Sequence, residues 1–377
     1  MYSHYITRTL PLLAIALASC RKSPKPTPET TTTLFPADAN ASPKGVYVLN
    51  EGNLGSNKAS LDYVDYIAGV YDLNLYNQAN PSITKGLGDV GNDIGVYGGK
   101  VYIVVNNSNK VEVLDLATNV HLGQVDIVNC RNVTFTGGKA YVSAYLGTVG
   151  NANDPNGVVD EIDTSALTIT RQVTVGRQPE QMAIVGQKLY VANSGAYSPS
   201  DYEHTVSVID LNSFAVIKLI DVAINLDRCI ADQYGKIYVT SRGDDYSIPS
   251  DLYVIDTNTD TVVKNFNIPA TNLWIDDNTA YVIATDFNFN TGQTTVSYSM
   301  IDVNADTVLN KQFITDGTDK LIQVPYGIAV NPTTKEVLVS DAEDYVSPGT
   351  LYCFDPTGKK LWSTTTGDIP GHFAFVY

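Results

Sequence analysis

The sequence predicts an all-β fold, a seven-bladed β-propeller whose blades are four-stranded antiparallel sheets. Three observations predict it: an apolar run containing tyrosine recurs after turn residues, a second apolar run ending in aspartate follows each copy, and a short apolar segment precedes most pairs. Successive copies lie about 40 to 57 residues apart, a spacing typical of propeller blades and too long for leucine-rich or ankyrin repeats. With 44% hydrophobic residues, the chain has ample material for a core.

The first run of each repeat has the composition of a β-strand. Val, Ile and Tyr dominate it, and Gly98-Gly99 and Gly137-Gly138 stand where tight hairpins need positive φ. We therefore expect strands at KGVYVLNEG (44), KVYIVVN (100), KAYVSAY (139), KLYVANS (188), KIYVTSR (236), TAYVIAT (279) and KEVLVSD (335).

The second run of each repeat ends in aspartate. The copies are LDYVD (61), VEVLD (111), VDEID (159), VSVID (206), LYVID (252), YSMID (298) and LYCFD (351). A series of carboxylates invites a catalytic interpretation, but aspartate at a turn usually accepts hydrogen bonds from its own backbone. One active site would not need seven copies, so we interpret these residues as turn caps.

The segments before the hairpins predict the innermost strands and the closure of the ring. They are NDIGVYG (92), RNVTFTG (131), EQMAIVG (180), RCIADQY (228), NLWIDD (272) and YGIAVNP (326). The N-terminal unit starts at Gly45 without such a segment, whereas the tail PGHFAFVY (370–377) is an inner strand without a hairpin. The tail is therefore expected to complete the first blade, which leaves only short sheet edges exposed.

The N-terminus reads as an export and anchoring segment. Residues 1–19 form a predicted lipoprotein signal peptide, because Arg8 precedes the apolar run LPLLAIALAS, and Leu17-Ala18-Ser19-Cys20 resembles a bacterial lipobox. Cys20 is then the lipidation site, and residues 20–44, rich in Pro and Thr, are an extended tether to a propeller over 45–377. The alternative is an ordinary signal peptide with an incidental Cys20.

Charge and cysteine usage limit the classes of partner. The chain has 24 Lys and Arg against 40 Asp and Glu, a net charge of -16, which repels nucleic acid and leaves the lipid anchor as the only predicted membrane contact. Cys130, Cys229 and Cys353 form no CxxC motif or Cys/His cluster, so we expect buried thiols without disulfides, and neither a metal site nor a cofactor.

One face of the propeller carries the candidate binding site. Loops that enter the inner strands meet around the mouth of the central channel, and the alignment places there Asn92, Asp93, Arg131, Asn132, Glu180, Gln181, Arg228, Asn272, Tyr326 and His372. This mixed, amide-rich ring suits a large polar neutral ligand. The long loops between second and third strands add a possible aromatic wall: Tyr145, Tyr197, Tyr202, Tyr246, Phe287, Phe289 and Tyr345. The alternative is that these rings only stiffen the rim.

Catalysis has weak support. No GxSxG or HExxH motif occurs, and the GLGDVG segment at 86–91 does not join a strand to a helix, so it is interpreted as a turn. We therefore expect no enzyme. The enzymatic alternative is a lyase or lactonase propeller with His372 and Glu180 as an acid–base pair. Trp274 stands where other inner strands carry small residues and is interpreted as a plug of the channel, with a pocket floor as the alternative.

The VYVLNEG opening, the KxYVxN and VxVID strands and the lipobox with its tether resemble the YncE-like seven-bladed propeller lipoproteins of Bacteroidota, and among them the BtuG cobalamin-binding surface lipoproteins. The resemblance covers nearly all of the mature chain. It implies an outer-membrane lipoprotein that captures cobalamin or another corrinoid for a TonB-dependent transporter. Arg21-Lys22-Ser23 follow Cys20 where acidic residues usually follow in relatives exported to the outer leaflet, so the cell surface and the periplasmic face both stay open. The alternative function is a platform that binds protein or glycan at the cell envelope.

Overall fold

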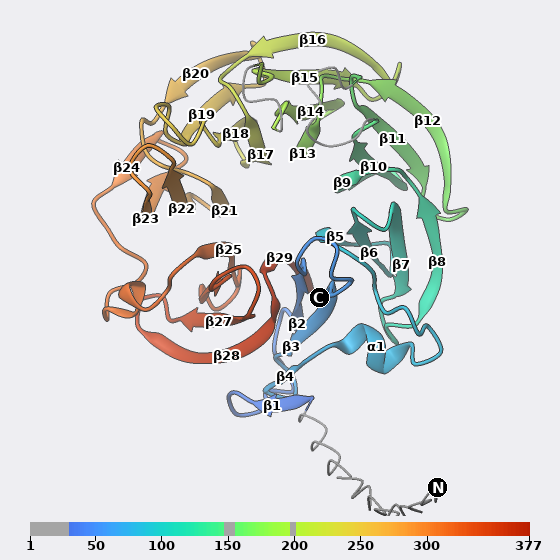
Figure 1. Ribbon diagram of the computed structural model, residues 1–377, viewed down its shortest axis with the longest axis vertical. Helices are drawn as coiled ribbons and strands as arrows, with labels where there is room; N and C mark the ends of the chain where they lie inside the picture. The colour runs from blue at the N-terminus through green and yellow to red at the C-terminus, as the bar shows by residue number, and fades with distance from the viewer. Residues whose placement is uncertain (1–29, 147–154, 197–200) are drawn as a thin grey trace, which may run out of the picture.

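The computed structural model describes residues 30–146, 155–196 and 201–377. Seven antiparallel sheets surround a central axis as the blades of a propeller, which confirms the predicted fold (Figure 1). Six blades have four strands, and the first has a fifth strand at its outer edge.

Each blade runs from an innermost strand at the channel to an outermost strand at the rim. The first blade contains β1 (Thr31–Thr33), β2 (Gly45–Asn50), β3 (Ser60–Asp65), β4 (Val70–Asp72) and β29 (Pro370–Val376). The second blade contains β5 (Gly91–Tyr97), β6 (Lys100–Val105), β7 (Lys110–Asp115) and β8 (His121–Asp126). The third contains β9 (Cys130–Thr136), β10 (Lys139–Ala144), β11 (Val158–Asp163) and β12 (Thr168–Thr174). The fourth contains β13 (Pro179–Val185), β14 (Lys188–Asn193), β15 (Thr205–Asp210) and β16 (Ala215–Asp221).

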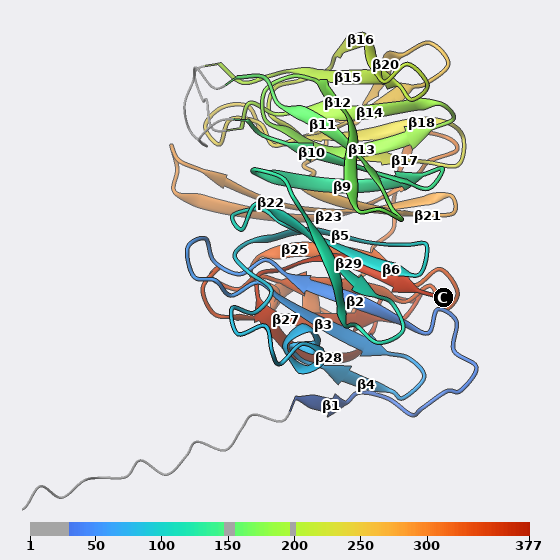
Figure 2. The same ribbon diagram turned by 90° about the vertical axis from the view of Figure 1, so that its right-hand side faces the viewer.

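The remaining blades follow the same order. The fifth blade contains β17 (Leu226–Ala231), β18 (Lys236–Ser241), β19 (Asp251–Asp256) and β20 (Thr261–Asn265). The sixth contains β21 (Asn272–Asp276), β22 (Thr279–Asn288), β23 (Gln293–Asp302) and β24 (Thr307–Leu309). The seventh contains β25 (Pro325–Val330), β26 (Val337–Asp341), β27 (Pro348–Phe354) and β28 (Lys360–Asp368). A short helix α1 (Leu75–Ala79) follows β4, and a 3-10 turn (Thr318–Lys320) precedes β25. In the sixth blade, the β22–β23 hairpin projects from one face of the disc (Figure 2).

The last strand closes the ring, as predicted. β29 pairs antiparallel with β2, with Leu49 opposite His372 and Gly45 opposite Val376. The innermost strand of the first blade therefore comes from the C-terminus, while the other strands of that blade come from the N-terminus (Figure 1). This arrangement joins the two ends of the propeller through a backbone ladder.

The segment expected to be a tether differs from the prediction in its second half. β1 adds to the outer edge of β4, and Phe35 stacks at 5.9 Å from Tyr66 and lies 6.0 Å from Trp362. The folded body therefore begins well before Gly45. The physical reason is that Phe35 interrupts the polar composition with a ring that the rim of the propeller can bury.

The predicted signal peptide, Cys20 and the first part of the tether lie outside the described residues and stay predictions. Within the ranges that the structure describes, no helix is long and apolar enough to span a bilayer.

The repeated K-x-Y sequence joins neighbouring blades. Lys188 Nζ lies 2.7 Å from Asp260 Oδ2, and the Tyr190 hydroxyl donates to Asp260 Oδ1 at 2.6 Å. Asp260 belongs to the turn before β20 in the next blade, and Tyr238 donates in the same way to Asp306 at 2.9 Å. Both acceptor aspartates have positive φ, a conformation that Asp tolerates better than most residues. The motif thus specifies contacts between blades as well as strands.

The aspartates that end the second runs act as turn caps. In Asp115, Asp163 and Asp302 the same carboxylate oxygen accepts the backbone N–H groups two and three residues further on, at 2.9 to 3.1 Å. This geometry confirms the interpretation that the repeated carboxylates serve local turns.

The core lies between the blades, and two sequence predictions concern it. Cys130, Cys229 and Cys353 are free and buried, as expected. Trp274 of β21 meets Phe375 of β29 edge-on at 5.8 Å between ring centroids. These strands belong to blades that are separated by the seventh, so the contact reaches across part of the channel and favours the plug interpretation of Trp274.

Candidate functional site

A polar cavity of about 670 Å³ opens at the mouth of the channel, where the inner strands begin. Ten residues were expected in the ring around the mouth. Seven of them line the cavity from the first three positions of their strands: Asn92, Arg131, Asn132, Glu180, Arg228, Tyr326 and His372. The topology thus gathers residues that are far apart in the sequence, since each blade contributes its strand start to one face.

The other three ring residues, Asp93, Gln181 and Asn272, have a different role from the one expected, and Asp93 Oδ2 accepts the backbone N–H of Val133 in the next blade at 2.9 Å. Gln181 Oε1 accepts the backbone N–H of Cys229 at 3.0 Å, and Asn272 Nδ2 donates to the carbonyl of Tyr326 at 2.9 Å. Inner strands of neighbouring blades share no ladder, so these amides supply hydrogen bonds between them. The prediction that Gln181 and Asn272 face a ligand is corrected accordingly.

Glu180 is the centre of a buried charge network. Its side chain is 1% exposed, and it accepts hydrogen bonds from Arg131 Nε at 3.0 Å, Arg242 Nη1 at 3.2 Å and the Tyr145 hydroxyl at 2.6 Å. Arg242 Nη2 also donates to Asp227 Oδ1 at 2.8 Å. Burial raises the pKa of the Glu180 carboxyl, but the charges of Arg131 and Arg242 outweigh burial and hold that pKa well below its usual value.

Tyr145 does not belong to an aromatic rim, contrary to the prediction. Its side chain is buried, its hydroxyl is used by Glu180, and the Arg131 guanidinium lies 5.0 Å from the ring centroid. A tyrosine at the end of β10 is placed to reach the next blade, and burial against charged neighbours fixes it there. Tyr145 therefore supports the floor of the site by holding Glu180.

A second group of polar residues lies around Glu51. Its Oε1 atom accepts the Tyr326 hydroxyl at 2.9 Å and lies 3.0 Å from His372 Nε2. His372 Nδ1 is 3.9 Å from Asp93 Oδ1. The acid–base pair expected for an enzyme, His372 with Glu180, is therefore not formed; His372 pairs with Glu51.

Arg228 differs from the other two arginines of the cavity. Its side chain is 12% exposed, and its Nε atom is buried without a hydrogen-bond partner in the described part of the chain. The nearest carboxylate oxygen, from Asp227, is 3.6 Å away. Buried donors are nearly always hydrogen-bonded in folded proteins. Arg228 thus presents unused hydrogen-bonding capacity to the cavity.

The rim aromatics divide into three positions. Tyr202 lines the cavity. Tyr246 stacks on Phe289 at 5.2 Å, and Phe287 meets Phe289 edge-on at 4.9 Å, yet all three rings keep between 41% and 59% exposure. Across the mouth, Tyr345 lies edge-on to Tyr326 at 5.9 Å. The rings therefore brace one another and still leave faces open. Tyr197 lies outside the described residues.

Five further residues of the mouth were missed by the sequence analysis. They are Glu51, Asp227, Arg242, Asp245 and Asp286, and all line the cavity. The signals were present, since Glu51 lies in VYVLNEG, Arg242 ends KIYVTSR, and Asp245 and Asp286 stand in two of the aromatic loops. The aromatic residues of those loops indicate a rim, but no local pattern indicates that their charged residues line the cavity.

The residues that the structure describes contain no group of three or more His, Cys, Asp or Glu side chains arranged to hold a metal ion.

The fold and the site define a seven-bladed propeller with a preformed polar cavity at the mouth of its channel. The chain belongs to the family described as a domain of unknown function, DUF5074, which it matches over residues 44–369. A comparison with curated proteins finds no match.

Solved structures share the architecture at low identity. A quinonprotein alcohol dehydrogenase-like protein from Bacteroides thetaiotaomicron is 15% identical with a TM-score of 0.56, over 88% of this chain and 78% of that one. The hydrazine synthase of Kuenenia stuttgartiensis is 18% identical with a TM-score of 0.55, over 70% and 76%. The WD40 domain of Neurospora crassa Pan2 is 11% identical with a TM-score of 0.52, over 74% and 80%. At these identities the similarity shows the fold alone.

Proposed function

We propose that the protein binds a polar small molecule in the cavity at the mouth of its channel and does not catalyse a reaction. The observation that carries this proposal is the polar cavity with Arg228 in its wall, because the ion-pair contact of Arg228 Nε with Asp227 is as long as 3.6 Å and Nε makes no hydrogen bond among the described residues. A ligand with a hydrogen-bond acceptor would bind this guanidinium group.

The other charges around the cavity favour a rigid site. Arg131 and Arg242 are bound by Glu180, and Arg242 is also bound by Asp227. His372 is held by Glu51. A wall whose side chains are already fixed loses little conformational freedom on binding, which favours high affinity for a ligand of matching shape.

The leading ligand, by the resemblance to YncE-like and BtuG lipoproteins, is cobalamin or a related corrinoid. The amide and hydroxyl groups of the wall match polar ligand edges, while exposed Tyr246, Phe287 and Phe289 offer apolar faces next to them. In this proposal Cys20 carries the lipid anchor at the outer membrane, on the cell surface or the periplasmic face, and the ligand passes to a TonB-dependent transporter.

Calorimetric titration with cyanocobalamin tests the proposal. Every strand lies between Thr31 and Val376, so a chain of residues 21–377 keeps the whole propeller and avoids lipidation. We expect nanomolar binding, on the order of -12 kcal/mol. The absence of both heat and a melting shift at high ligand concentration would contradict corrinoid capture and direct the search to glycans and envelope proteins.

A pair of variants locates the binding site. Arg228→Gln removes the unpaired donor and is expected to weaken binding by about 10- to 100-fold, the range for a hydrogen bond from a charged group. Lys264→Gln, which removes an exposed cation from the outer strand β20, is the control and should leave affinity unchanged. Equal affinities of the two variants would exclude Arg228 as a ligand contact.

A further inference from the structure

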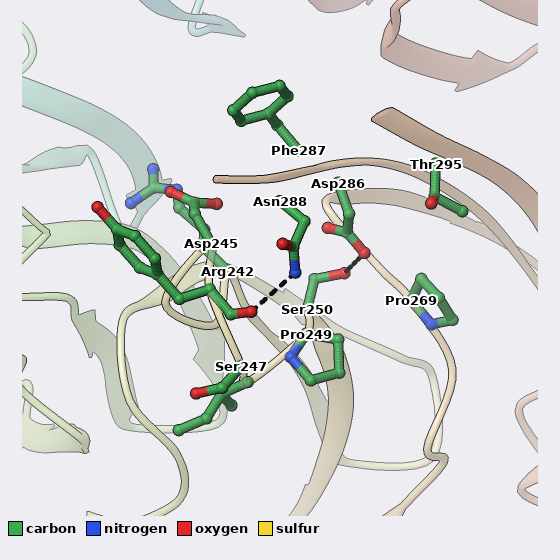
Figure 3. A pocket seen from close by; sticks show the side chains of 12 residues that line it. Arg242, Asp245, Ser247, Pro249, Ser250, Pro269, Asp286, Phe287, Asn288 and Thr295 are labelled. Carbon is green, nitrogen blue, oxygen red and sulfur yellow. Dashed lines mark hydrogen bonds between the residues drawn. The ribbon is translucent and has the colours of Figure 1, made fainter. Parts of the chain in front are cut away.

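A second cavity of about 250 Å³ lies beside the mouth, between the loop of residues 242–250 in the fifth blade and the β22–β23 hairpin of the sixth (Figure 3). Arg242, Asp245 and Asp286 line both cavities, so the smaller one is a side arm of the larger. Tyr246 and Phe287 contribute aromatic faces to its wall. We refer to this cavity as the side pocket.

The side pocket has more negative charge than its described residues neutralise. The one cation among the described residues that line it, Arg242, is already bound by Glu180 at 3.2 Å and Asp227 at 2.8 Å, both in the main cavity. Asp286 accepts one hydrogen bond, from Ser250 Oγ at 2.9 Å, and among the described residues neither Asp286 nor Asp245 forms an ion pair. Two carboxylates therefore face the pocket without an ion pair, and Arg242 acts on Asp245 only from a longer distance.

Partial burial makes these two carboxylates costly to keep ionised. Burial raises the pKa of Asp286, and Asp245 raises it further. Burial also raises the pKa of Asp245, with a further contribution from Asp244, and the charge of Arg242 offsets this only in part. Asp244 of the same loop differs. Burial raises its pKa, but hydrogen bonds from three backbone N–H groups outweigh burial and hold that pKa below its usual range. The donors are Ile248, Tyr246 and Ser247. A cation in the pocket would relieve the repulsion between Asp245 and Asp286.

The aromatic faces of the side pocket point to an organic cation. Tyr246 and Phe287 are 48% and 41% exposed, and Phe289 braces both rings from outside the pocket. Aromatic faces attract ammonium groups, and the attraction strengthens where water is partly excluded. A neutral sugar would also stack on these rings, but it would leave both carboxylates of the pocket without a counter-charge.

The walls of the pocket are held in place by hydrogen bonds between loop and hairpin. Asn288 Nδ2 and Asn290 Nδ2 donate to the carbonyl of Tyr246 at 2.8 and 3.0 Å, and the backbone N–H of Phe289 donates to the carbonyl of Asp245 at 2.9 Å. Figure 3 shows the Asn288 hydrogen bond and the Ser250–Asp286 hydrogen bond close to each other in the pocket wall. The site is therefore preformed.

We propose that the side pocket binds an organic ammonium group, with Asp245 and Asp286 as counter-ions and Tyr246 and Phe287 as cation–π faces. The proposal goes beyond the capture of a ligand in the main cavity. It assigns a cationic subsite that a ligand seated at the mouth would reach, because the two cavities share one wall. A free ammonium compound would occupy the subsite alone.

Saturation-transfer NMR with tetramethylammonium chloride, at constant ionic strength adjusted with sodium chloride, tests the proposal on residues 21–377. We expect transfer to the methyl protons with a dissociation constant on the order of 10 mM or tighter, as for a small cation in a single subsite. The double variant Asp245→Asn/Asp286→Asn should abolish it. The matched control Asp126→Asn/Asp221→Asn removes two exposed carboxylates from the outer strands β8 and β16 and should leave it unchanged.

A second variant separates the aromatic contribution from the charge. Phe287→Leu keeps a branched apolar side chain, though a shorter one, and removes the ring, which should weaken the signal several-fold. No transfer to the wild-type protein, or equal transfer to the two double variants, would overturn the proposal. Tetramethylammonium is not a corrinoid, so the two proposals can fail separately. A negative cyanocobalamin titration would not contradict the ammonium site, and a negative tetramethylammonium experiment would not contradict corrinoid capture.

Discussion

Replacement of Glu180 by Gln tests whether the floor of the cavity is held by charge. The variant keeps the size of the side chain and removes its charge, while Arg131 and Arg242 remain beside it. Arg131 keeps its hydrogen bond to Asn92, and Arg242 keeps Asp227. The N–H₂ group of the introduced amide would also face arginine donors, and it has no lone pair with which to accept hydrogen bonds from them.

The expected loss of stability follows from burial. Glu180 is 1% exposed and the Arg131 side chain 12%, so their pair is shielded from water, whereas Arg242 is 31% exposed. Removing one partner of a buried ion pair lowers the free energy of unfolding by about 3 to 5 kcal/mol. Because both arginines keep one partner, we expect the lower end, about 3 kcal/mol. With a urea m-value on the order of 3 kcal/mol/M, the unfolding midpoint falls by about 1 M.

The pH dependence has a defined sign. The folded-state pKa of Glu180 lies below its usual value of 4.5, so the ionised form stabilises the fold. This contribution is fully present at pH values above the pKa of Glu180 in the unfolded chain. It is lost as the pH falls through the lower pKa that Glu180 has in the folded protein. The difference in unfolding free energy between wild type and Glu180→Gln should therefore be constant near pH 7 and shrink below about pH 4.5.

Urea unfolding followed by tryptophan fluorescence or circular dichroism at several pH values measures both effects. Asp221→Asn is the matched control, since its carboxylate is 82% exposed and pairs with a half-exposed His204. We expect that control to change stability by at most about 0.5 kcal/mol. Two results would refute the reasoning. One is a urea midpoint of Glu180→Gln equal to that of the wild type, and the other is a difference in unfolding free energy between the two proteins that does not change with pH below 4.5.

Three further predictions follow from the joints between the blades and the core. Asp260→Asn, which removes the charge held by Lys188 and Tyr190, should lower the urea midpoint by an amount equivalent to about 1 to 3 kcal/mol; an unchanged midpoint would mean that the K-x-Y contact is dispensable. Phe35→Ala should destabilise by about 1 to 2 kcal/mol through lost contact with Trp362, whereas an unstructured segment would show no effect. In residues 21–377 the thiols should react with a disulfide reagent only after unfolding, because burial raises their pKa; reaction in the folded state would contradict burial of Cys130, Cys229 and Cys353.

Much of the fold was predictable because its signals are local. The run KVYIVVN became β6, and the segment PGHFAFVY became β29, which pairs with β2 as expected. Strand composition, turn glycines and the aspartate caps each act within a few residues of chain, so they can be read directly. The closure of the ring by the C-terminal strand required only a count of inner strands and hairpins.

The position of the mouth was also predictable, but its pairings were not. Seven of the ten expected ring residues line the cavity, since propeller topology brings every inner-strand start to one face. Arg242 and Glu180, however, are 62 residues apart, and Tyr326 and Glu51 are 275 apart. No local pattern states which of several charged residues on seven blades will meet.

The sequence by itself therefore determined the strands, the turns, the number of blades and the face on which polar residues gather. Only the tertiary structure decided that Tyr145 is buried beneath Arg131, that Gln181 joins two blades, and that Arg228 keeps an unpaired donor. The physical reason is that periodicity is a property of consecutive residues, whereas burial and pairing depend on distances between blades that only the closed ring sets.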